Sequence, residues 1–359
     1  MRVCILGKNL TSLTLAKALI NKDIDVDLYF SNTKNNINHS RTLGISKSNV
    51  EFVNEHIVNI ENILWKLNKI EIYTDQLKQE KLLNFEDNKD QLFSIIKNHQ
   101  FYSLLEKKLL KTKNFKKKSY NNKDLSLVQK YELIINCDIK NNISKKFFSK
   151  NIQKKYNSFA YTTIINHEKV LNNTATQIFT KQGPLAYLPI SNLQTSVVYS
   201  VHNALNNNKE GIRDLILKHN NKYKIKNISE IEFFELSSSN LRSYYYKNIL
   251  AFGDLLHKVH PLAGQGFNMT IRDIKTLLEI IQKRTDLGLP IDSTIGIEFD
   301  KKAKHKNFVF LNGIDFIYQF FNFERKTSNI FLSKSVQYLG KNNLVNKFFT
   351  KIADEGILF

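Results

Sequence analysis

Residues 253–273, GDLLHKVHPLAGQGFNMTIRD, form the segment with the clearest chemical character in the chain. The segment begins with Gly253 and Asp254 and ends in a helical pattern. Gly264 and Gly266 lie two residues apart, so the main chain there can approach a ligand without a clash from a Cβ atom. A helix that begins at this point offers free N–H groups and positive potential. The segment therefore predicts a binding site for a large, planar, anionic ligand.

The elements predicted around this segment place it at the end of a strand. Residues 247–252 read as a buried strand, so Asp254 is positioned to accept a hydrogen bond from a ribityl or ribose hydroxyl. A helix is predicted over 266–283. Its apolar face consists of Phe267, Ile271, Ile274, Leu278 and Ile281.

The N-terminus has the β-turn-α-β order that opens a dinucleotide-binding fold. A strand is predicted over 2–6, a turn at Gly7, a helix over 10–20 and a second strand over 25–30. A polar loop follows at 31–40. The next predicted elements are a helix over 50–67, edge strands near 70–74 and 91–96, a helix over 101–110 and a strand over 132–136.

The middle of the chain alternates as strands, and its end is helical. Strands are predicted over 159–165, 176–180, 186–189 and 196–201, with a helix near 211–219 and mostly helix over 297–359. The predicted fold class is α/β: a Rossmann-type dinucleotide-binding domain with an inserted β-sheet domain and C-terminal helices. The expected boundaries are 1–75 and 76–155 for the nucleotide domain, 156–245 for the inserted sheet domain, 246–290 for the second nucleotide part and 291–359 for the helices.

Residues 253–273 resemble the signature GD-x(5)-HP-x-x-GQG-x-N-x-x-x-x-D of the class A flavoprotein monooxygenases, and are most similar to the ubiquinone-biosynthesis hydroxylases. The resemblance implies that FAD is bound by the residues of this signature. Asp254, after Gly253, would contact the ribityl chain, and the main chain of the GQG loop would bind the edge of the flavin ring. The loop residues are Pro261, Gly264, Gln265, Gly266 and Asn268.

Further stretches follow the order of the same family. Arg41, in SRTLGIS, resembles the arginine that reaches the FAD phosphates, a task that suits a guanidinium; an ordinary surface arginine is the alternative. The stretch GPLAYLP at 183–189 resembles a strand of the substrate lobe. His167 and Glu168 also match this lobe, and we interpret them as a structural pair rather than an acid–base couple.

Three departures concern the AMP half of the site. Of the family's G-x-G-x-x-G, only Gly7 remains, with Asn9 and Ser12 in the other glycine positions. Phe30 ends the second strand where the family has an acidic residue for the ribose. The family's Asp-Gly reads Asp138-Ile139, so Asp138 is an FAD contact or a cap at the strand end.

Composition limits the other function classes. The net charge of +20 comes from lysine spread over the chain, so we expect no nucleic-acid partner. The spacing of His257 and His260 after Asp254 resembles that of metal ligands, but the adjoining glycines argue against a metal, and we predict none. Two cysteines predict no disulfide framework and a reducing compartment. No apolar stretch approaches the ~18 residues of a membrane span.

The resemblance implies hydroxylation of the aromatic ring of a polyprenylated phenol in ubiquinone biosynthesis, with NAD(P)H and O₂. It implies a cytoplasmic protein with peripheral contact to the inner membrane. The expected partners are the aromatic polyprenyl substrate and either a second copy of the chain or a ubiquinone-biosynthesis complex. No catalytic side chain is predicted. The alternative is a divergent, non-catalytic partner in a biosynthetic complex, which the lost glycines favour and the retained Gln265 and Asn268 oppose.

Overall fold

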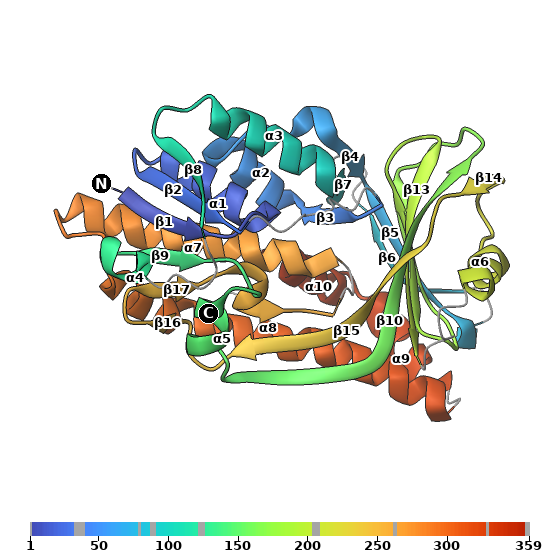
Figure 1. The fold of residues 1–359 in the computed structure, drawn as a ribbon. Coiled ribbons are helices and arrows are strands. Elements are labelled where there is room, and N and C mark those ends of the chain that lie inside the picture. Colours follow the sequence, from blue (N-terminus) through green and yellow to red (C-terminus); the bar gives the residue numbers. More distant parts are fainter. Residues whose placement is uncertain are drawn as a thin grey trace.

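The computed structural model describes residues 2–31, 40–77, 80–86, 91–120, 126–202, 209–260, 264–327 and 330–355. Within them the chain forms three sheets, which Figure 1 shows together with their helices. The six-stranded sheet has the order β16-β17-β9-β1-β2-β8. Its strands are β1 (Arg2–Leu6), β2 (Asp25–Phe30), β8 (Phe115–Ser119), β9 (Ile134–Asn136), β16 (Tyr245–Tyr246) and β17 (Ile249–Ala251).

The nine-stranded sheet lies at the other end of the molecule (Figure 1). Its order is β18-β15-β10-β13-β12-β11-β5-β6, and β14 pairs with β10. The strands are β5 (Lys69–Thr74), β6 (Lys81–Glu86), β10 (Asn151–His167), β11 (Thr174–Phe179), β12 (Pro184–Pro189), β13 (Gln194–His202), β14 (Ile225–Ile228), β15 (Glu232–Leu241) and β18 (His257–Lys258).

A small three-stranded sheet has the order β3-β7-β4, and its strands lie along the chain between strands of the two larger sheets. It consists of β3 (Thr42–Ser46), β7 (Phe93–Lys97) and β4 (Leu64–Leu67). The α-helices are α1 (Leu10–Ile20), α2 (Lys47–His56), α3 (Asn98–Leu110), α4 (Leu127–Lys130), α5 (Asn142–Phe147), α6 (Lys209–Lys218), α7 (Gln265–Asp286), α8 (Thr294–Thr327), α9 (Ile330–Gly340) and α10 (Asn343–Glu355). Short 3₁₀ turns are η1 (Glu61–Ile63), η2 (Asp75–Leu77) and η3 (Gly253–Leu255).

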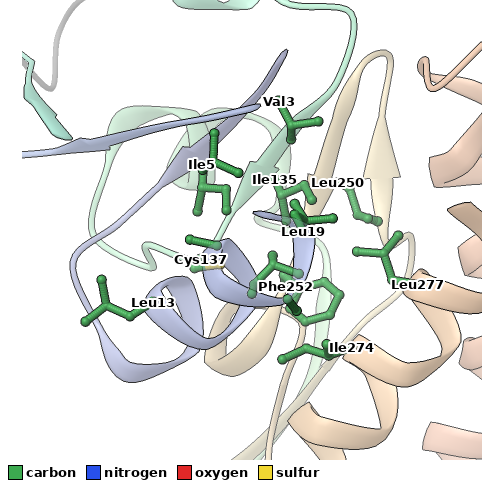
Figure 2. Close-up of a cluster of buried hydrophobic side chains, with 14 of the residues drawn as sticks. Val3, Ile5, Leu13, Leu19, Ile135, Cys137, Leu250, Phe252, Ile274 and Leu277 are labelled. Atoms are coloured by element: carbon green, nitrogen blue, oxygen red, sulfur yellow. The ribbon is translucent and has the colours of Figure 1, made fainter. Parts of the chain in front are cut away.

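The main core lies where the six-stranded sheet packs against α1 and α7. Figure 2 shows the side chains that meet there, from β1, α1, β9, β17 and α7. The strands are parallel apart from β16. The central strands β1, β9 and β17 are buried on both faces, so they read as short, mostly apolar runs. The labelled members are Val3, Ile5, Leu13, Leu19, Ile135, Cys137, Leu250, Phe252, Ile274 and Leu277.

Both cysteines are buried free thiols. Burial raises the pKa of each thiol, and the nearby carboxylates of Asp138 and Asp254 raise the pKa of Cys137 further. Both thiols are therefore protonated and pack as small apolar groups.

Three predicted elements were wrong. The helix expected over 50–67 ends at His56, because Ile57, Val58 and Ile60 are buried in an irregular turn rather than on one helix face, and Leu64–Leu67 continues as β4. The two expected edge strands have neighbours on both sides. β5 lies between β11 and β6, and β7 lies between β3 and β4, because each pairs with a strand from elsewhere in the chain.

The other predicted helices and strands are confirmed within a few residues, including the β1-α1-β2 opening and the long helix α7, except that β10 begins at Asn151 rather than at 159. Most of the polar loop expected over 31–40 lies outside the described residues. β5 and β6 come from residues assigned above to the nucleotide domain, and they pair into the nine-stranded sheet. Within the described ranges, no helix has both the length and the apolar character that a bilayer span requires.

Candidate functional site

The turn between β1 and α1 is built around Gly7. Its φ of +121° lies in a region that L side chains rarely adopt, and a Cβ there would lie 3.4 Å from the main-chain N of Asp138. The Gly7 amide donates to Tyr29 O at 2.8 Å, at the end of β2. The turn at Gly7 is therefore closely packed between the ends of β2 and β9, which is the position of the tight turn in a dinucleotide-binding fold.

The N-terminus of α1 is closed by a capping box. Asn9 Oδ1 accepts from the Ser12 amide at 2.9 Å, and Ser12 Oγ accepts from the Asn9 amide at 3.0 Å. Asn9 Nδ2 also donates to Cys137 O at 2.8 Å. The two residues at the family's glycine positions thus satisfy each other's main-chain amides at the start of α1, where the family binds the pyrophosphate.

Asp138 makes the contacts of a strand-end cap. Its Oδ1 accepts from the Lys140 amide at 2.8 Å, its own amide donates to Asn136 Oδ1 at 3.1 Å, and its carbonyl accepts from Ser144 Oγ. The following Ile139 is half exposed. In this arrangement the Asp138 carboxylate stabilises the turn from β9 into α5.

Phe30 stands at the end of β2 among lysines. The ammonium groups of Lys8 and Lys117 each lie 5.4 Å from the centroid of its ring. These distances allow cation–π contact. The side chain cannot accept a hydrogen bond from a ribose hydroxyl, so the position where the family has a ribose acceptor is apolar and flanked by positive charge.

Gly253 brings the end of β17 against α1. Its φ is +63°, and a Cβ there would lie 2.7 Å from Thr11 Cγ2. Asp254 follows in η3 with an exposed side chain. Its charge contributes to the raised pKa of Cys137, which places it near the end of β9. Asp254 is therefore brought to the same end of the sheet as the α1 N-terminus.

The GQG loop leads into α7 with an open backbone. Gly264 is the N-cap residue with φ +64°, no side chain of the described residues caps the helix, and its first turn carries no acidic residue. Gln265 is buried, whereas a Cβ added at Gly266 would meet no described atom within 4 Å. Pro261 lies outside the described residues. Among the described residues, the first turn of this 22-residue helix is therefore open beside Gly266.

Asn268 ties this loop to β3. Its fully buried amide group donates to Gly44 O at 3.0 Å and to Gly264 O at 3.2 Å, and accepts from the Ser46 amide at 3.0 Å and Asn49 Nδ2 at 2.9 Å. Arg41, which is exposed, immediately precedes β3. We call these four hydrogen bonds of Asn268 the Asn268 latch. The latch fixes the GQG loop against β3 and therefore close to Arg41, which precedes β3.

The last residue of the signature has a structural role. Asp273 Oδ2 lies 2.5 Å from His257 Nε2, and its Oδ1 accepts from Asn307 Nδ2 at 2.9 Å. All three side chains are buried, so they join β18, α7 and α8. Among the described residues, no group of three His, Cys, Asp or Glu is arranged to hold a metal ion.

His167 and Glu168 do not form an acid–base couple. The two ring nitrogens of buried His167 pair with Glu168 O at 2.8 Å and Thr195 Oγ1 at 3.0 Å. The Glu168 carboxylate instead lies 3.6 Å from Lys224 Nζ. This matches the structural interpretation of the pair.

A second cluster of polar side chains lies between the nine-stranded sheet and α8, and sequence reasoning missed it apart from His260. Its members are Tyr156, Ser158, His202, His260 and Tyr318. Ser158 Oγ is 2.8 Å from His202 Nδ1, and Tyr318 Oη is 3.1 Å from His202 Nε2. A pocket of about 440 Å³, partly open solvent, reaches the cluster at His202 and Tyr318. We call these five residues the histidine–tyrosine cluster.

The flavin half and the AMP half of the nucleotide site fit FAD to different degrees. The open backbone at Gly266 and the uncapped first turn of α7 suit the polar edge of a flavin ring. On the AMP half, the capping box occupies the Ser12 amide, and the Asp138 carboxylate accepts from the Lys140 amide in the turn after β9. Phe30 stands where the family has an acceptor for the ribose. The site therefore fits the flavin more closely than the adenosine.

No protein-family model matches the chain. Its sequence relatives include the mitochondrial ubiquinone biosynthesis monooxygenase of Dictyostelium discoideum, 32% identical over 26% of this chain and 19% of that protein. The 3-demethoxyubiquinol 3-hydroxylase of Escherichia coli is 26% identical over 41% of this chain and 39% of that protein. The chain is similar to the ubiquinone-biosynthesis hydroxylases. The matches cover half or less of the length of these relatives.

Solved structures share the fold over nearly the whole chain. The p-nitrophenol 4-monooxygenase of Pseudomonas putida superposes with a TM-score of 0.77 at 10% identity, covering 97% of both chains. A variant of HpxO from Klebsiella pneumoniae, in complex with FAD, has a TM-score of 0.75 at 10% identity and covers 99% of both chains. The fold is that of the FAD-dependent monooxygenases, which confirms the predicted fold class and the resemblance.

Proposed function

We propose that this protein is an FAD-dependent monooxygenase that hydroxylates the aromatic ring of a polyprenylated phenol, with NAD(P)H as electron donor. The observation that carries the proposal is the uncapped first turn of α7 beside the open backbone of Gly266. A helix N-terminus left open in this way favours an electron-rich ring edge. The sequence relatives support the choice of substrate class, because they are named as ubiquinone-biosynthesis hydroxylases.

Under this proposal the flavin is held by main-chain donors of the GQG loop, by Asp254 and by Arg41. Asp254 accepts from the ribityl chain, and Arg41 pairs with the phosphates. FAD, when bound, supplies the redox chemistry that activates O₂ after reduction by NAD(P)H. The chain's own task is to position the ring of the substrate and to exclude water. The Asn268 latch serves that task, because it fixes the loop against β3 through four hydrogen bonds.

The test is turnover by the FAD-loaded protein. We expect NAD(P)H oxidation and O₂ uptake to depend on a polyprenylphenol, and mass spectrometry to detect a product that has gained one oxygen atom. A protein that holds FAD but forms no hydroxylated product from any polyprenylphenol would contradict the enzymatic function.

A polyprenyl substrate also leads us to propose peripheral contact with a membrane. Large apolar side chains on α8 and α9 are exposed, among them Phe316, Phe323, Phe331 and Tyr338. Lysines at 326, 334 and 341 are exposed along the same stretch. Aromatic and basic side chains together suit an anionic lipid surface. Sedimentation with vesicles that contain anionic lipid tests this; equal sedimentation with neutral vesicles would contradict the electrostatic part.

The second candidate function is a non-catalytic partner in a biosynthetic complex. The capping box of Asn9 and Ser12 favours it, because it occupies a donor at the position of the pyrophosphate. On this alternative the protein would not retain FAD, and it would bind other enzymes of the same pathway. FAD titration separates the two candidates.

A further inference from the structure

His260 is a buried histidine that has no hydrogen-bond partner among the described residues. Its side chain is 1% exposed, and neither Nδ1 nor Nε2 is paired. Burial, reinforced by the nearby His202, lowers its pKa to about 3, so the imidazole is neutral. A neutral imidazole offers one donor and one acceptor, and leaving either of them unpaired in a protein interior is unfavourable.

The rings around His260 form an aromatic enclosure. The ring of Tyr318 lies 4.4 Å from the imidazole, and that of Tyr156 lies 4.9 Å away, edge to face. Tyr156 Oη is already committed to Asp315 Oδ1 at 3.1 Å. Met269, Phe310 and Ile314 belong to the same buried cluster as the two tyrosines. The imidazole of His260 therefore lies among aromatic and apolar side chains, and its two nitrogens are unpaired polar atoms of this cluster.

Backbone irregularity in β10 helps to build this enclosure. The register between β10 and β15 shifts between Lys155 and Phe159, and within the shift Asn157 has a φ of +49°. A bulge of this kind re-aims neighbouring side chains, and strained backbone of this kind is concentrated at functional sites. Here the shift includes Tyr156, which faces His260, and Ser158, which holds His202.

His260 also lies close in sequence to the flavin-facing loop. Three residues separate it from Gly264, and Tyr318 Oη contacts His202, which lines the pocket together with Tyr318. The pocket adds the aromatic side chains of Phe179 and Phe321. Tyr318 thus lines the pocket on one side and contacts the His260 imidazole on the other.

We propose that the His260 imidazole hydrogen-bonds the ring hydroxyl of a phenolic substrate and thereby sets which ring the site accepts. The proposal rests on the proposed function, since it concerns the substrate of the same site. A hydroxyl group is one donor with acceptor lone pairs, so it complements an imidazole that lacks both kinds of partner. His260 is then a positioning and specificity residue, and the rings of Tyr156 and Tyr318 hold its imidazole in place.

The test compares the binding of 4-nitrophenol with that of 4-nitroanisole, which has the same ring but no hydroxyl donor. Both bind to the full-length protein in a titration followed by absorbance or fluorescence. We expect the wild type to bind 4-nitrophenol roughly 3- to 10-fold more tightly, the worth of one hydrogen bond. His260→Phe, which keeps a ring between the two tyrosines, should reduce the ratio to about one. His260→Gln, which keeps a donor and an acceptor, should retain part of it.

A matched control is His167→Phe. His167 is equally buried but has partners on both nitrogens, so its replacement should lower the melting temperature and leave the binding ratio unchanged. His260→Phe should leave the melting temperature unchanged or raise it, because it removes unpaired polar atoms. An unchanged ratio in folded His260→Phe, or a wild type with no preference for the phenol, would overturn the proposal. FAD retention, read from the visible spectrum of the same samples, reports on the proposed function separately.

Discussion

Replacement of Asn9 by glycine is the substitution that most directly probes the altered half of the nucleotide site. The Asn9 side chain makes two hydrogen bonds, one from the Ser12 amide at 2.9 Å and one to Cys137 O at 2.8 Å. Asn9→Gly removes both and frees the Ser12 amide toward the turn at Gly7. We expect the variant to be less stable and to bind FAD more tightly.

The magnitudes follow from these contacts. Glycine at an N-cap lowers stability by only a few tenths of a kcal/mol, and a typical hydrogen bond contributes about 1 kcal/mol, so the loss is about 1–2 kcal/mol. At about 2.1 cal/mol/K per residue, a chain of 359 residues has an unfolding entropy of roughly 0.75 kcal/mol/K, so the melting temperature should fall by about 1–3 °C. A freed amide that meets a phosphate is worth about 1.5 kcal/mol or more, which is roughly tenfold in affinity.

The assay combines thermal unfolding with FAD titration followed by flavin fluorescence. Asn220→Gly is the matched control, because Asn220 likewise accepts from the amide three residues on, at 3.0 Å, and donates to a main-chain carbonyl, at 2.6 Å. Asn220 lies in the loop between α6 and β14, outside the nucleotide site. The control should lose stability without a change in FAD affinity. If Asn9→Gly loses stability and its FAD affinity is unchanged or weaker, the capping box does not occupy a phosphate position and the reasoning fails.

Three further predictions concern the rest of the site and the sheet that supports it. Asp254→Ala should weaken FAD binding by about tenfold in equilibrium dialysis without a change in melting temperature, because Asp254 is exposed; equal affinity would count against its role. Asn268→Ala removes four buried hydrogen bonds, so unfolding by urea should show a loss of about 3–4 kcal/mol; a loss below about 1 kcal/mol would contradict the latch. Burial opposes ionisation of Asp27, but hydrogen bonds from Lys118 and Tyr131 lower its pKa overall. Its contribution to stability is therefore present above the unfolded pKa and lost as the pH falls, and Asp27→Asn should flatten the acid side of the stability–pH curve.

The sequence alone predicts the elements that carry strong local patterns. The β1-α1-β2 opening and α7 follow from apolar periodicity and from glycine at the turns. Gly253, the first residue of the signature, packs against Thr11 in α1, the helix that follows the turn at Gly7. These features are local, and they lie where propensity, turn chemistry and burial agree.

Other features depend on partners far along the chain. β5 is an interior strand because it pairs with β11, which begins at Thr174, 100 residues after β5 ends at Thr74. The local alternation of apolar and polar residues does not encode that pairing. The histidine–tyrosine cluster joins Tyr156 with Tyr318, and the bulge that aims Tyr156 leaves no mark in the pattern of apolar residues. His260 was present in the signature, but only its two nitrogens, which have no hydrogen-bond partner among the described residues, distinguish it from an ordinary core histidine.

The capping box had a signal that could have been used. An Asn followed three residues later by Ser, at the start of an apolar helical run, is a pattern typical of a capped helix. Interpreted only as lost glycines, the two residues indicate a damaged site. Their hydrogen bonds show instead that they stabilise α1.

The visible absorption spectrum of the freshly purified protein shows whether the open first turn of α7 binds a flavin. We expect the absorption bands of oxidised flavin, or their appearance on addition of FAD together with quenching of flavin fluorescence. A colourless protein whose addition leaves the fluorescence of FAD unchanged would contradict flavin binding at this helix.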